Sequence, residues 1–399
     1  MEKSSDKHRG RLAAILLLVL AASSACGSGS AMRNPSPTPS PSPSPTATPS
    51  PPACPDRVFA GLTEDQRIGQ LLNLGLADDR LGPTEINLIQ ADHIGSVWFV
   101  ATSTAGVAGI HAVTSAVQAQ VSSTSTANVG FFIAANQEGG VIQAMQGPGF
   151  SRIPTAVVQG TMAPATLQAQ ATTWGQQLHA AGINFNFAPV MDVVPPGTDA
   201  QNQPIGVLQR EYGHDPATVG SHGVAVLTGM HQSGIAVSLK HFPGLGSVAG
   251  NTDFTTATDT TTTATDPYLQ SFKDGVAANA DFVMVALALY PRIDPNHLAA
   301  FSSVVTTQML RTSLGFGGVI ISDDLGATAA VASIPPGTRA IDFLSAGGDM
   351  IISKTAAPAH AMLQAIRARV AADATFRQRV DDAALRVLKA KQAYGLLPC

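Results

Sequence analysis

Eight short apolar runs, many of them rich in β-branched residues, constrain the fold more than any other feature of this sequence. Most of the runs lack strict alternation of apolar and polar residues, which is typical of strands that are buried on both faces. We therefore expect eight buried β-strands. The runs are IGQLLNLGL (68–76), IGSVWFV (94–100), VGFFIAA (129–135), INFNFAPV (183–190), IAVSLKHF (235–242), DFVMVAL (281–287), GVIISDDL (318–325) and DMIISK (349–354).

Segments of helical character lie between these runs. Examples are ATLQAQATTWGQQLHAAG (165–182), PATVGSHGVAVLTGMHQSG (216–234) and SVVTTQMLRTSLG (303–315), and several of them end in Gly, which commonly stops a helix. Strand–helix alternation repeated eight times predicts an α/β fold, a (β/α)8 TIM-type barrel built as a single domain. An open doubly wound sheet is the alternative.

The first 26 residues have the order of a secretory signal peptide. Residues 1–11 carry four Lys and Arg, residues 12–22 are an unbroken apolar run, and Ser-Ser-Ala-Cys follows. The apolar run is too short to span a bilayer comfortably. The small-residue site that ends at Cys26 predicts a lipoprotein signal, in which this cysteine is acylated and becomes the new N-terminus. A plain secretory signal cleaved nearby is the alternative.

Residues 27–53 form a spacer rich in Pro, Ser and Thr. Its alternating prolines fix φ and remove amide donors, so this segment cannot pair into a sheet or continue a helix, and we expect it to be extended and semi-rigid. Such a spacer would hold residues 54–399 away from the membrane surface. We therefore expect an exported protein on the outer face of the cell membrane, or alternatively a secreted one.

Two further cysteines, Cys54 and Cys399, bracket the remaining domain. Because an exported protein folds in an oxidising environment, the pair predicts a disulfide that joins the two ends of the domain. Two free thiols are the alternative. The sequence has no CxxC motif and no His/Cys cluster, so we expect no metal site.

Charge and composition limit the class of partner. The chain has 23 Lys and Arg and 27 Asp and Glu, and removing residues 1–26 takes away four and two of these, which leaves a net charge near −6. This balance argues against nucleic acid as a partner. No second low-complexity break follows residue 54, so residues 54–399 are expected to form one domain. We also expect a monomer.

Polar residues cluster just beyond several predicted strands, at the rim where barrel enzymes carry their active sites. Charged groups that recur at this rim are hard to explain by packing. The segments that contain these polar residues are Asn136-Gln137-Glu138-Gly139-Gly140, Asp192, Lys240-His241 and Ser322-Asp323-Asp324.

Longer motifs surround these residues and give the chain a family resemblance. The motifs occur in the same order as in glycoside hydrolase family 3, and the chain resembles this family from about residue 60 to 395. The resemblance is specifically to its single-domain bacterial β-N-acetylhexosaminidase branch. KHFPG and GVIISDDL at strand ends make the resemblance specific. The motifs are NQEGG (136–140), GPGFSRIP (147–154), FAPVMDV (187–193), REYGHDP (210–216), KHFPGLG (240–246) and LRTSLGFGGVIISDDL (310–325).

The resemblance implies that Asp323 is the catalytic nucleophile. When the leaving group departs from a glycoside, an oxocarbenium-like centre forms, and an ionised carboxylate can trap it as a covalent glycosyl-enzyme that water later opens. The alternative is that Asp323 and Asp324 are capping acids of the next helix, an interpretation that suits Asp324 better.

The same resemblance implies a set of substrate-binding residues. Lys240 and His241 correspond to a pair that donates hydrogen bonds to sugar hydroxyls, with a buried core ion pair as the alternative. Arg210 corresponds to an arginine that contacts the sugar, with a loop-fixing salt bridge as the alternative. Asn136 and Glu138 complete the set, and no cofactor is implied.

The acid/base element departs from the family pattern. Leu245 stands at the first His position of the usual PGHG, and residues 251–253 (Asn-Thr-Asp) align with the Asp-Ser-His that normally supplies the catalytic His-Asp pair. Either Asp253 supplies the proton itself, if partial burial raises its pKa, or the loop binds sugar without catalysing. Residues 243–264 form a long Gly/Thr-rich connection, which predicts a loop that closes over the sugar and positions Asp253.

Other positions also differ from the family pattern. Asn136 stands where Asp commonly precedes Gln-Glu-Gly-Gly, Ala144 replaces an arginine that contacts substrate, and Leu287 falls where a histidine often follows the sixth strand. These losses affect the choice of sugar more than the reaction class, which depends on Asp323. Asp192 is expected to organise the barrel.

The predicted function is that of a retaining, exo-acting glycoside hydrolase, a β-N-acetylhexosaminidase that acts on cell-wall or extracellular glycans. A β-glucosidase or another exo-β-glycosidase of the same family is one alternative. A membrane-tethered sugar-binding protein with lost or weak catalysis is the other. The expected partners are a carbohydrate substrate and, through a lipid anchor, the membrane.

Overall fold

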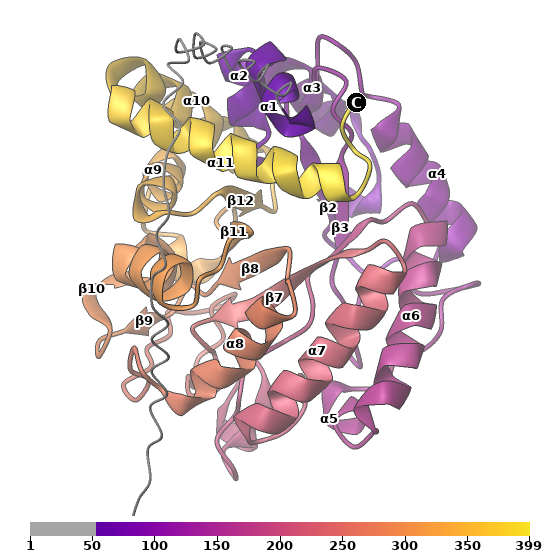
Figure 1. Cartoon of the computed structure of the whole chain (residues 1–399), viewed down its shortest axis with the longest axis vertical. Helices are drawn as coiled ribbons and strands as arrows, with labels where there is room; N and C mark the ends of the chain where they lie inside the picture. Colours follow the sequence, from indigo (N-terminus) through magenta and orange to yellow (C-terminus); the bar gives the residue numbers. More distant parts are fainter. Residues whose placement is uncertain (1–52) are drawn as a thin grey trace, which may run out of the picture. The chain divides into compact units, whose positions relative to one another are not determined.

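Eight parallel strands close into a barrel in the computed structural model, which describes residues 53–399 (Figure 1). The strand order around the barrel is β1-β12-β11-β8-β7-β6-β3-β2. Each strand lies inside one of the eight predicted runs, so the barrel is confirmed and an open sheet is excluded. The strands are β1 (Leu72–Leu76), β2 (Ser96–Phe99), β3 (Phe132–Ala135), β6 (Phe185–Asn186), β7 (Ala236–Phe242), β8 (Phe282–Val285), β11 (Val319–Asp324) and β12 (Met350–Ser353).

Helices surround this barrel (Figure 1). Local sequence explains several of their starts: α3, α6, α7 and α9 have Pro in the first turn, where the missing amide costs nothing, and Asp215 caps α7 by accepting a hydrogen bond from Thr218 N. The helices are α1 (Cys54–Gly61), α2 (Glu64–Gly69), α3 (Pro83–Asp92), α4 (Gly106–Gln118), α5 (Ala156–Gln159), α6 (Pro164–Ala180), α7 (Pro216–Gln232), α8 (Gln270–Ala277), α9 (Pro336–Ala346), α10 (Ala356–Ala372) and α11 (Ala374–Ala393).

The helix that was predicted over residues 303–315 is present as η6 (Val304–Ser313), in which the backbone hydrogen bonds follow the wider π pattern. Two small antiparallel pairs were not predicted. They are β4 (Gln137–Gly139) with β5 (Ile142–Gln143), and β9 (Leu289–Tyr290) with β10 (Asp294–Leu298). None of the helices in the described part of the chain is long and apolar enough to cross a membrane.

Aromatic rings fill the barrel near the amino ends of its strands. Phe132, Phe185 and Phe282 begin β3, β6 and β8, and the ring centroids of Phe185 and Phe282 are 4.1 Å apart, while those of Phe132 and Phe282 are 5.4 Å apart. Such offset and edge-on packing is favourable beyond the area that it buries. The polar residues at the carboxyl ends of the strands therefore lie above a closed apolar floor.

The last helix, α11, closes the amino end of the barrel. The Lys391 ammonium is buried and donates to Gln70 Oε1 at 2.7 Å and to the carbonyl oxygens of Gly95 and Gly130 at 2.7 and 2.8 Å. These three residues lie just before β1, β2 and β3. Burial lowers the pKa of Lys391 to about 7.

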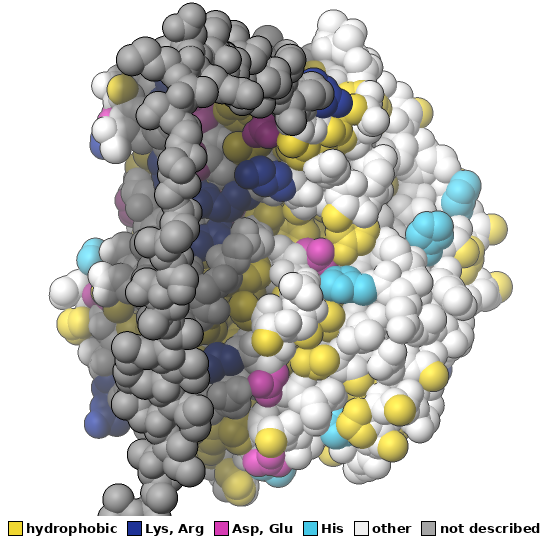
Figure 2. Space-filling view, in the orientation of Figure 1, with side chains coloured by type: hydrophobic (Ala, Val, Ile, Leu, Met, Phe, Trp, Pro, Cys, Tyr) yellow, Lys and Arg dark blue, Asp and Glu magenta, His cyan; other side chains and the backbone are white. Residues whose placement is uncertain are grey.

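Arginines reinforce the same side of the barrel. On the face shown in Figure 2, Lys and Arg side chains gather over α11. Arg379 and Arg386 of this helix form ion pairs with the buried Asp349, which also pairs with Arg311 of η6. Asp349 Oδ2 accepts a hydrogen bond from Ile320 N of β11, so this cluster fixes α11 against the start of β12.

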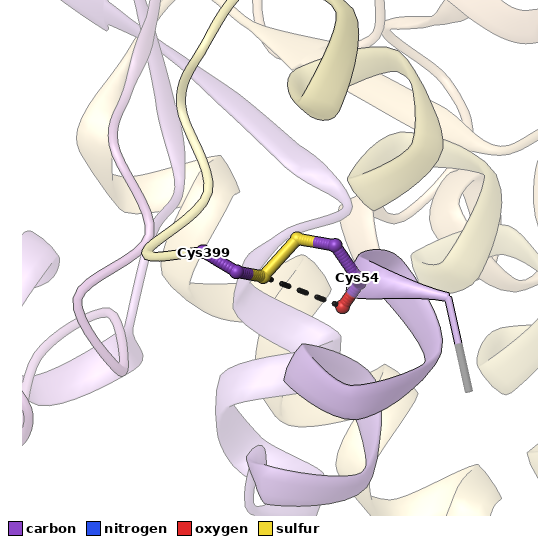
Figure 3. Close-up of a disulfide and its surroundings, with 2 residues drawn as sticks. All are labelled: Cys54 and Cys399. Carbon is purple, nitrogen blue, oxygen red and sulfur yellow. Dashed lines mark hydrogen bonds between the residues drawn. A yellow bond between two sulfur atoms is a disulfide. The ribbon is translucent and has the colours of Figure 1, made fainter. Parts of the chain in front are cut away.

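The predicted disulfide between Cys54 and Cys399 is formed in the structure, with the two Cα atoms 6.1 Å apart (Figure 3). It joins the first turn of α1 to the last residue of the chain, and α1 packs against α11. The two ends of the described segment are therefore held together on the amino side of the barrel. Cys26, the predicted signal peptide and the predicted spacer up to residue 52 lie outside the described residues.

Candidate active site

A cavity of about 300 Å³ opens among the loops that follow the barrel strands. Its polar lining comes from the ends of β7 and β11 and from the segments that follow β3, β6, β7, β11 and β12. These parts are brought together because parallel strands end at the same side of a barrel. The predicted site residues that line it are Asn136, Glu138, Arg210, Lys240, His241, Asp253 and Asp323. The set predicted from sequence thus converges on one cavity.

Asp323 lies at the carboxyl end of β11 and lines this cavity. One of its carboxylate oxygens accepts a hydrogen bond from Asp324 N at 2.8 Å. Burial raises the pKa of Asp323; the charge of His241 opposes this shift, and the charge of Asp253 adds to it. A carboxylate that faces a cavity, and that still has lone pairs without a protein partner, is available to react with a ligand.

Asp324 has a different role from its neighbour, although it also borders the cavity. Its carboxylate accepts hydrogen bonds from three backbone amides: Gly326 N at 2.8 Å, Ala327 N at 3.1 Å and Lys354 N at 2.8 Å. These bonds fix the turn after β11 and tie it to the end of β12. The capping interpretation therefore applies to Asp324, while Asp323 is left facing the cavity.

Glu138 holds two of the predicted sugar-binding cations in place. Arg210 donates to both carboxylate oxygens through Nε and Nη2, each at 2.8 Å, and Lys240 Nζ lies 2.5 Å from Oε1. Burial opposes ionisation of Glu138, but the charges of Arg210 and Lys240 outweigh it and lower the pKa of this carboxyl to about 2. The three side chains form one buried, charged unit.

The remaining contacts of the two cations orient them. Arg210 Nη1 donates to Pro204 O at 2.8 Å, and Lys240 Nζ donates to Asn136 Oδ1 at 2.8 Å. Burial lowers the pKa of Lys240, and the charge of Glu138 opposes that shift. Arg210 and Lys240 therefore form ion pairs, as expected if they have a structural role. Both also line the cavity, as expected if they bind a ligand.

His241 is fixed from behind by Asp192. The Nδ1 atom of His241 lies 2.7 Å from Asp192 Oδ2, and Asp192 Oδ1 accepts hydrogen bonds from His241 N at 3.1 Å and Leu245 N at 2.8 Å. Asp192 is fully buried and does not line the cavity. It organises the end of β7 and the turn that follows, and the other ring nitrogen of His241, Nε2, is hydrogen-bonded to Arg210 Nη2 at 3.5 Å.

Asp253 lies on the long connection between β7 and the short helix η4 (Pro267–Leu269), which contains no other helix or strand. The connection borders the cavity through Leu245 and residues 251–254. Asp253 itself is exposed, so the partial burial considered in the sequence analysis is absent. Its charge nevertheless contributes to the raised pKa of Asp323, so the two carboxylates interact electrostatically.

The departures from the family pattern occupy different places. Asn136 lines the cavity, whereas Ala144 is buried at 8% exposure and Leu287 is fully buried, and neither of these two borders the cavity. Leu245, at 2% exposure, forms part of the cavity wall. Ala144 and Leu287, which stand where the family pattern has an arginine and a histidine, are therefore packed inside the protein.

Sequence reasoning missed several cavity residues, among them apolar side chains from strands and the charged Lys354 after β12. An apolar side chain on a strand gives no sequence signal that separates cavity lining from core, since both are buried and apolar. Phe254 and Lys354 are exposed. Phe254 could have been noticed by its position beside Asp253, and Lys354 by its position at the end of the eighth run. Among the missed residues are Trp98, Val100, Phe187, Met284, Ile352, Phe254 and Lys354.

The comparison with known families agrees with this geometry. Residues 63–390 match the family described as Glycosyl hydrolase family 3 N terminal domain. The fold and the site are those of a glycoside hydrolase. The chain belongs to glycosyl hydrolase family 3.

Individual relatives are similar over most of the chain. The beta-hexosaminidase of Stenotrophomonas maltophilia (strain K279a) is 31% identical over 293 residues, which cover 71% of this chain and 82% of the relative. The crystal structure of a beta-N-acetylhexosaminidase from Beutenbergia cavernae DSM 12333 has a TM-score of 0.81 and 46% identity, covering 83% of this chain and 99% of that chain. The structure of a family 3 beta-N-acetylglucosaminidase from Paenibacillus sp. str. FPU-7 has a TM-score of 0.75 and 27% identity. The match covers 84% of this chain and 63% of that chain.

The unit formed by Glu138 and its two cations makes a prediction about stability. In Glu138→Gln, Arg210 and Lys240 stay buried without a negative partner, and we expect the free energy of unfolding near pH 7 to fall by about 3–5 kcal/mol. Because the pKa of Glu138 is about 2, below its ordinary value of 4.5, this contribution is present above about pH 4.5 and is lost as the pH falls toward 2. The difference between wild type and variant should therefore shrink near pH 3.

Urea unfolding of both proteins at the two pH values measures this difference. Glu64→Gln is a matched control, because Glu64 forms an exposed ion pair with Arg377, and removing it should cost less than about 1 kcal/mol. If Glu138→Gln were as stable as the wild type at pH 7, the buried charges would not depend on Glu138.

Proposed function

We propose that the protein is a retaining, exo-acting β-N-acetylhexosaminidase that removes a terminal N-acetylhexosamine from cell-wall or extracellular glycans. The observation that carries the proposal is the position of Asp323, which lines a cavity beside three side chains that carry N–H donors. The cavity is at the small end of the range for small-molecule sites, about 300–1,000 Å³, which suits one terminal sugar better than the middle of a glycan chain. The printed names of the relatives support the choice of N-acetylhexosamine.

In the first step, a carboxylate oxygen of Asp323 forms a bond to the anomeric carbon while the bond from that carbon to the leaving oxygen breaks. The leaving oxygen takes a proton from the carboxyl group of Asp253. Arg210, Lys240 and His241 supply N–H donors that hold the sugar hydroxyls while charge develops at the ring. The product of this step is a covalent glycosyl ester on Asp323 and a free alcohol.

In the second step, water attacks the anomeric carbon of the ester. Asp253, now ionised, accepts a proton from this water, the bond to Asp323 breaks, and the sugar leaves with its original configuration. Asp323 returns as a carboxylate and Asp253 as an acid. Because Asp253 is exposed, a bound sugar or a movement of the connection between β7 and η4 must shield it before it acts as the acid.

We further propose that the protein is a lipoprotein on the outer face of the cell membrane, anchored through Cys26. The described part of the chain begins on the amino side of the barrel, where Cys54 is bonded to Cys399, and Asp323 lies at the carboxyl ends of the strands. A tether that enters at Cys54 would be attached on the side of the barrel opposite to the cavity. A Cys26→Ser variant should leave the membrane fraction for the soluble one, and a wild type that is equally soluble would contradict the anchor.

Substrate choice and the covalent step can be tested together. We expect the nitrophenyl glycoside of N-acetyl-β-glucosamine to be hydrolysed with a higher kcat/KM than the β-glucoside and other β-glycosides. A 5-fluoro glycosyl fluoride that keeps the 2-acetamido group should add one sugar to the protein, because the ring fluorine slows hydrolysis of the ester. Intact mass and peptide mapping should place this sugar on Asp323.

The control for this experiment is Asp323→Asn, which should form no adduct and should lose about 10³-fold or more in kcat. A higher kcat/KM on the β-glucoside would favour the β-glucosidase alternative. If the wild type formed no adduct and Asp323→Asn matched its activity, the protein would be a binding protein.

The role of Asp253 predicts a dependence on the leaving group. In Asp253→Asn, kcat/KM for a glycoside with a poor leaving group should fall by about 10²–10⁴-fold, because the departing oxygen no longer receives a proton, while an activated aryl glycoside should lose far less. The high-pH limb of the kcat/KM profile should also be lost, because that limb reports ionisation of the general acid, which Asp253→Asn removes.

Asp266→Asn is the matched control, because Asp266 lies near the end of the same connection and does not line the catalytic cavity. It should leave both substrates and the pH profile close to those of the wild type. Equal and negligible losses on both substrates in Asp253→Asn would remove this residue from the proposed role.

A further inference from the structure

The structure also points to the place where the leaving group of the substrate binds. We propose that the ring of Phe254 forms the subsite for this leaving group, by stacking against the sugar from which the terminal residue is cleaved. This inference rests on the proposed function, because it assumes that a glycoside is cleaved between Asp323 and Asp253. It assigns to the mouth of the cavity a residue that selects a sugar as the leaving group.

The exposure of Phe254 is unusual within this chain. All 15 phenylalanines lie in the described residues, and Phe254 is the exposed one among them, with 81% of its surface accessible. The other exposed large hydrophobic side chains are valines, of which Val141 is the most exposed at 65%. An aromatic ring in water gives up the free energy that burial would provide, and a ligand that covers the ring would recover it.

Phe254 is also placed at the catalytic cavity. It lines the same cavity as Asp323, and it directly follows Asp253 in the chain. Glu138 and Lys240 also line this cavity, and their side chains are charged and buried. The cavity therefore has a buried polar end and an exposed aromatic group at its mouth.

The turn that carries Phe254 is anchored to the barrel. The amide of Phe254 donates to Asn251 O at 3.0 Å, and Asn251 Oδ1 accepts from Asp253 N at 3.0 Å. The carbonyl oxygens of Thr252 and Asp253 accept hydrogen bonds from Ala330 N at 3.2 Å and Ala329 N at 3.3 Å. Thr252 is buried at 3% exposure. The ring is thus presented from a backbone that is tied to the loop after β11.

The chemistry of the proposed reaction decides which part of the substrate reaches this ring. Asp323 attacks the anomeric carbon from one face, and the leaving oxygen departs on the opposite face, where the general acid must stand. If Asp253 is that acid, everything beyond the leaving oxygen lies beside Asp253. Phe254 is the next residue, so its ring meets the leaving group and not the terminal sugar.

A sugar ring is a suitable partner for an exposed phenyl ring. Its hydroxyl groups point outward around the ring, and its axial C–H bonds form an apolar face that can cover the ring of Phe254 without burying an unpaired polar group. Stacking of this kind fixes the leaving sugar without hydrogen bonds. It therefore favours glycosides whose leaving group is a sugar over those with a small leaving group.

Two substrates separate this subsite from the catalytic cavity. In Phe254→Ala, kcat/KM for a β-linked disaccharide of N-acetylglucosamine should fall about 10-fold, whereas kcat/KM for N-acetyl-β-glucosaminyl fluoride should stay within about 2-fold of the wild type, because a fluorine atom is too small to reach the ring. Phe254→Trp should keep the activity on the disaccharide. Val141→Ala is the matched control, since it removes an exposed apolar side chain that does not line the cavity, and it should change neither substrate.

Equal losses on both substrates in Phe254→Ala would show that the ring supports the loop and would overturn the proposal, as would unchanged kinetics on both. Binding gives a readout that does not need turnover. In an Asp323→Asn background, calorimetry should show that Phe254→Ala weakens the disaccharide about 10-fold and leaves N-acetylglucosamine unchanged. If the wild type hydrolysed neither substrate, the proposed function would fail, and this binding difference would still support or overturn the subsite.

Discussion

The buried ion pairs of Glu138 are the interaction on which the site depends. Arg210 follows β6, Lys240 belongs to β7, and both meet a carboxylate that follows β3. Two cations brought this close without an anion would repel each other and pay the cost of leaving water. With Glu138 ionised between them, the three segments are fixed relative to one another. The positions of Arg210 and Lys240 at the cavity follow from this one carboxylate.

Much of the packing and cross-linking of the barrel lies at one end of its axis, and the cavity lies at the other. Aromatic rings, Lys391, the Asp349 cluster and the disulfide all lie toward the amino ends of the strands, and they make the lower part of the barrel rigid and closed. The carboxyl ends can then carry charged groups such as Asp192, whose oxygens are all used to hold the end of β7. Loops above this base can differ from those of relatives without loss of the fold.

The strands could be predicted from the sequence because buried strands leave uninterrupted apolar runs, but their lengths could not. The run 68–76 includes Ile68 and Gly69, which belong to α2, because an apolar run alone does not distinguish a buried helix from a strand. The run 183–190 contains only the two-residue strand β6. The site residues were found through motifs. The pairing of Glu138 with Arg210, 72 residues away, and with Lys240 has no local signal, because it arises only when the barrel closes.

The two carboxylates at the cavity differ in surroundings in a way that suits two different roles. Asp323 is enclosed, and Asp253 is exposed on a loop, and the charge of Asp253 raises the pKa of Asp323. Such an interaction is mutual, so each charge opposes the other. In the proposed mechanism Asp323 becomes a neutral ester after the first step. The repulsion then disappears, Asp253 can carry the negative charge, and it is ready to accept a proton from water. In this proposal a carboxyl group replaces the His-Asp pair of the family pattern, because the change at the nucleophile switches the acid to a base.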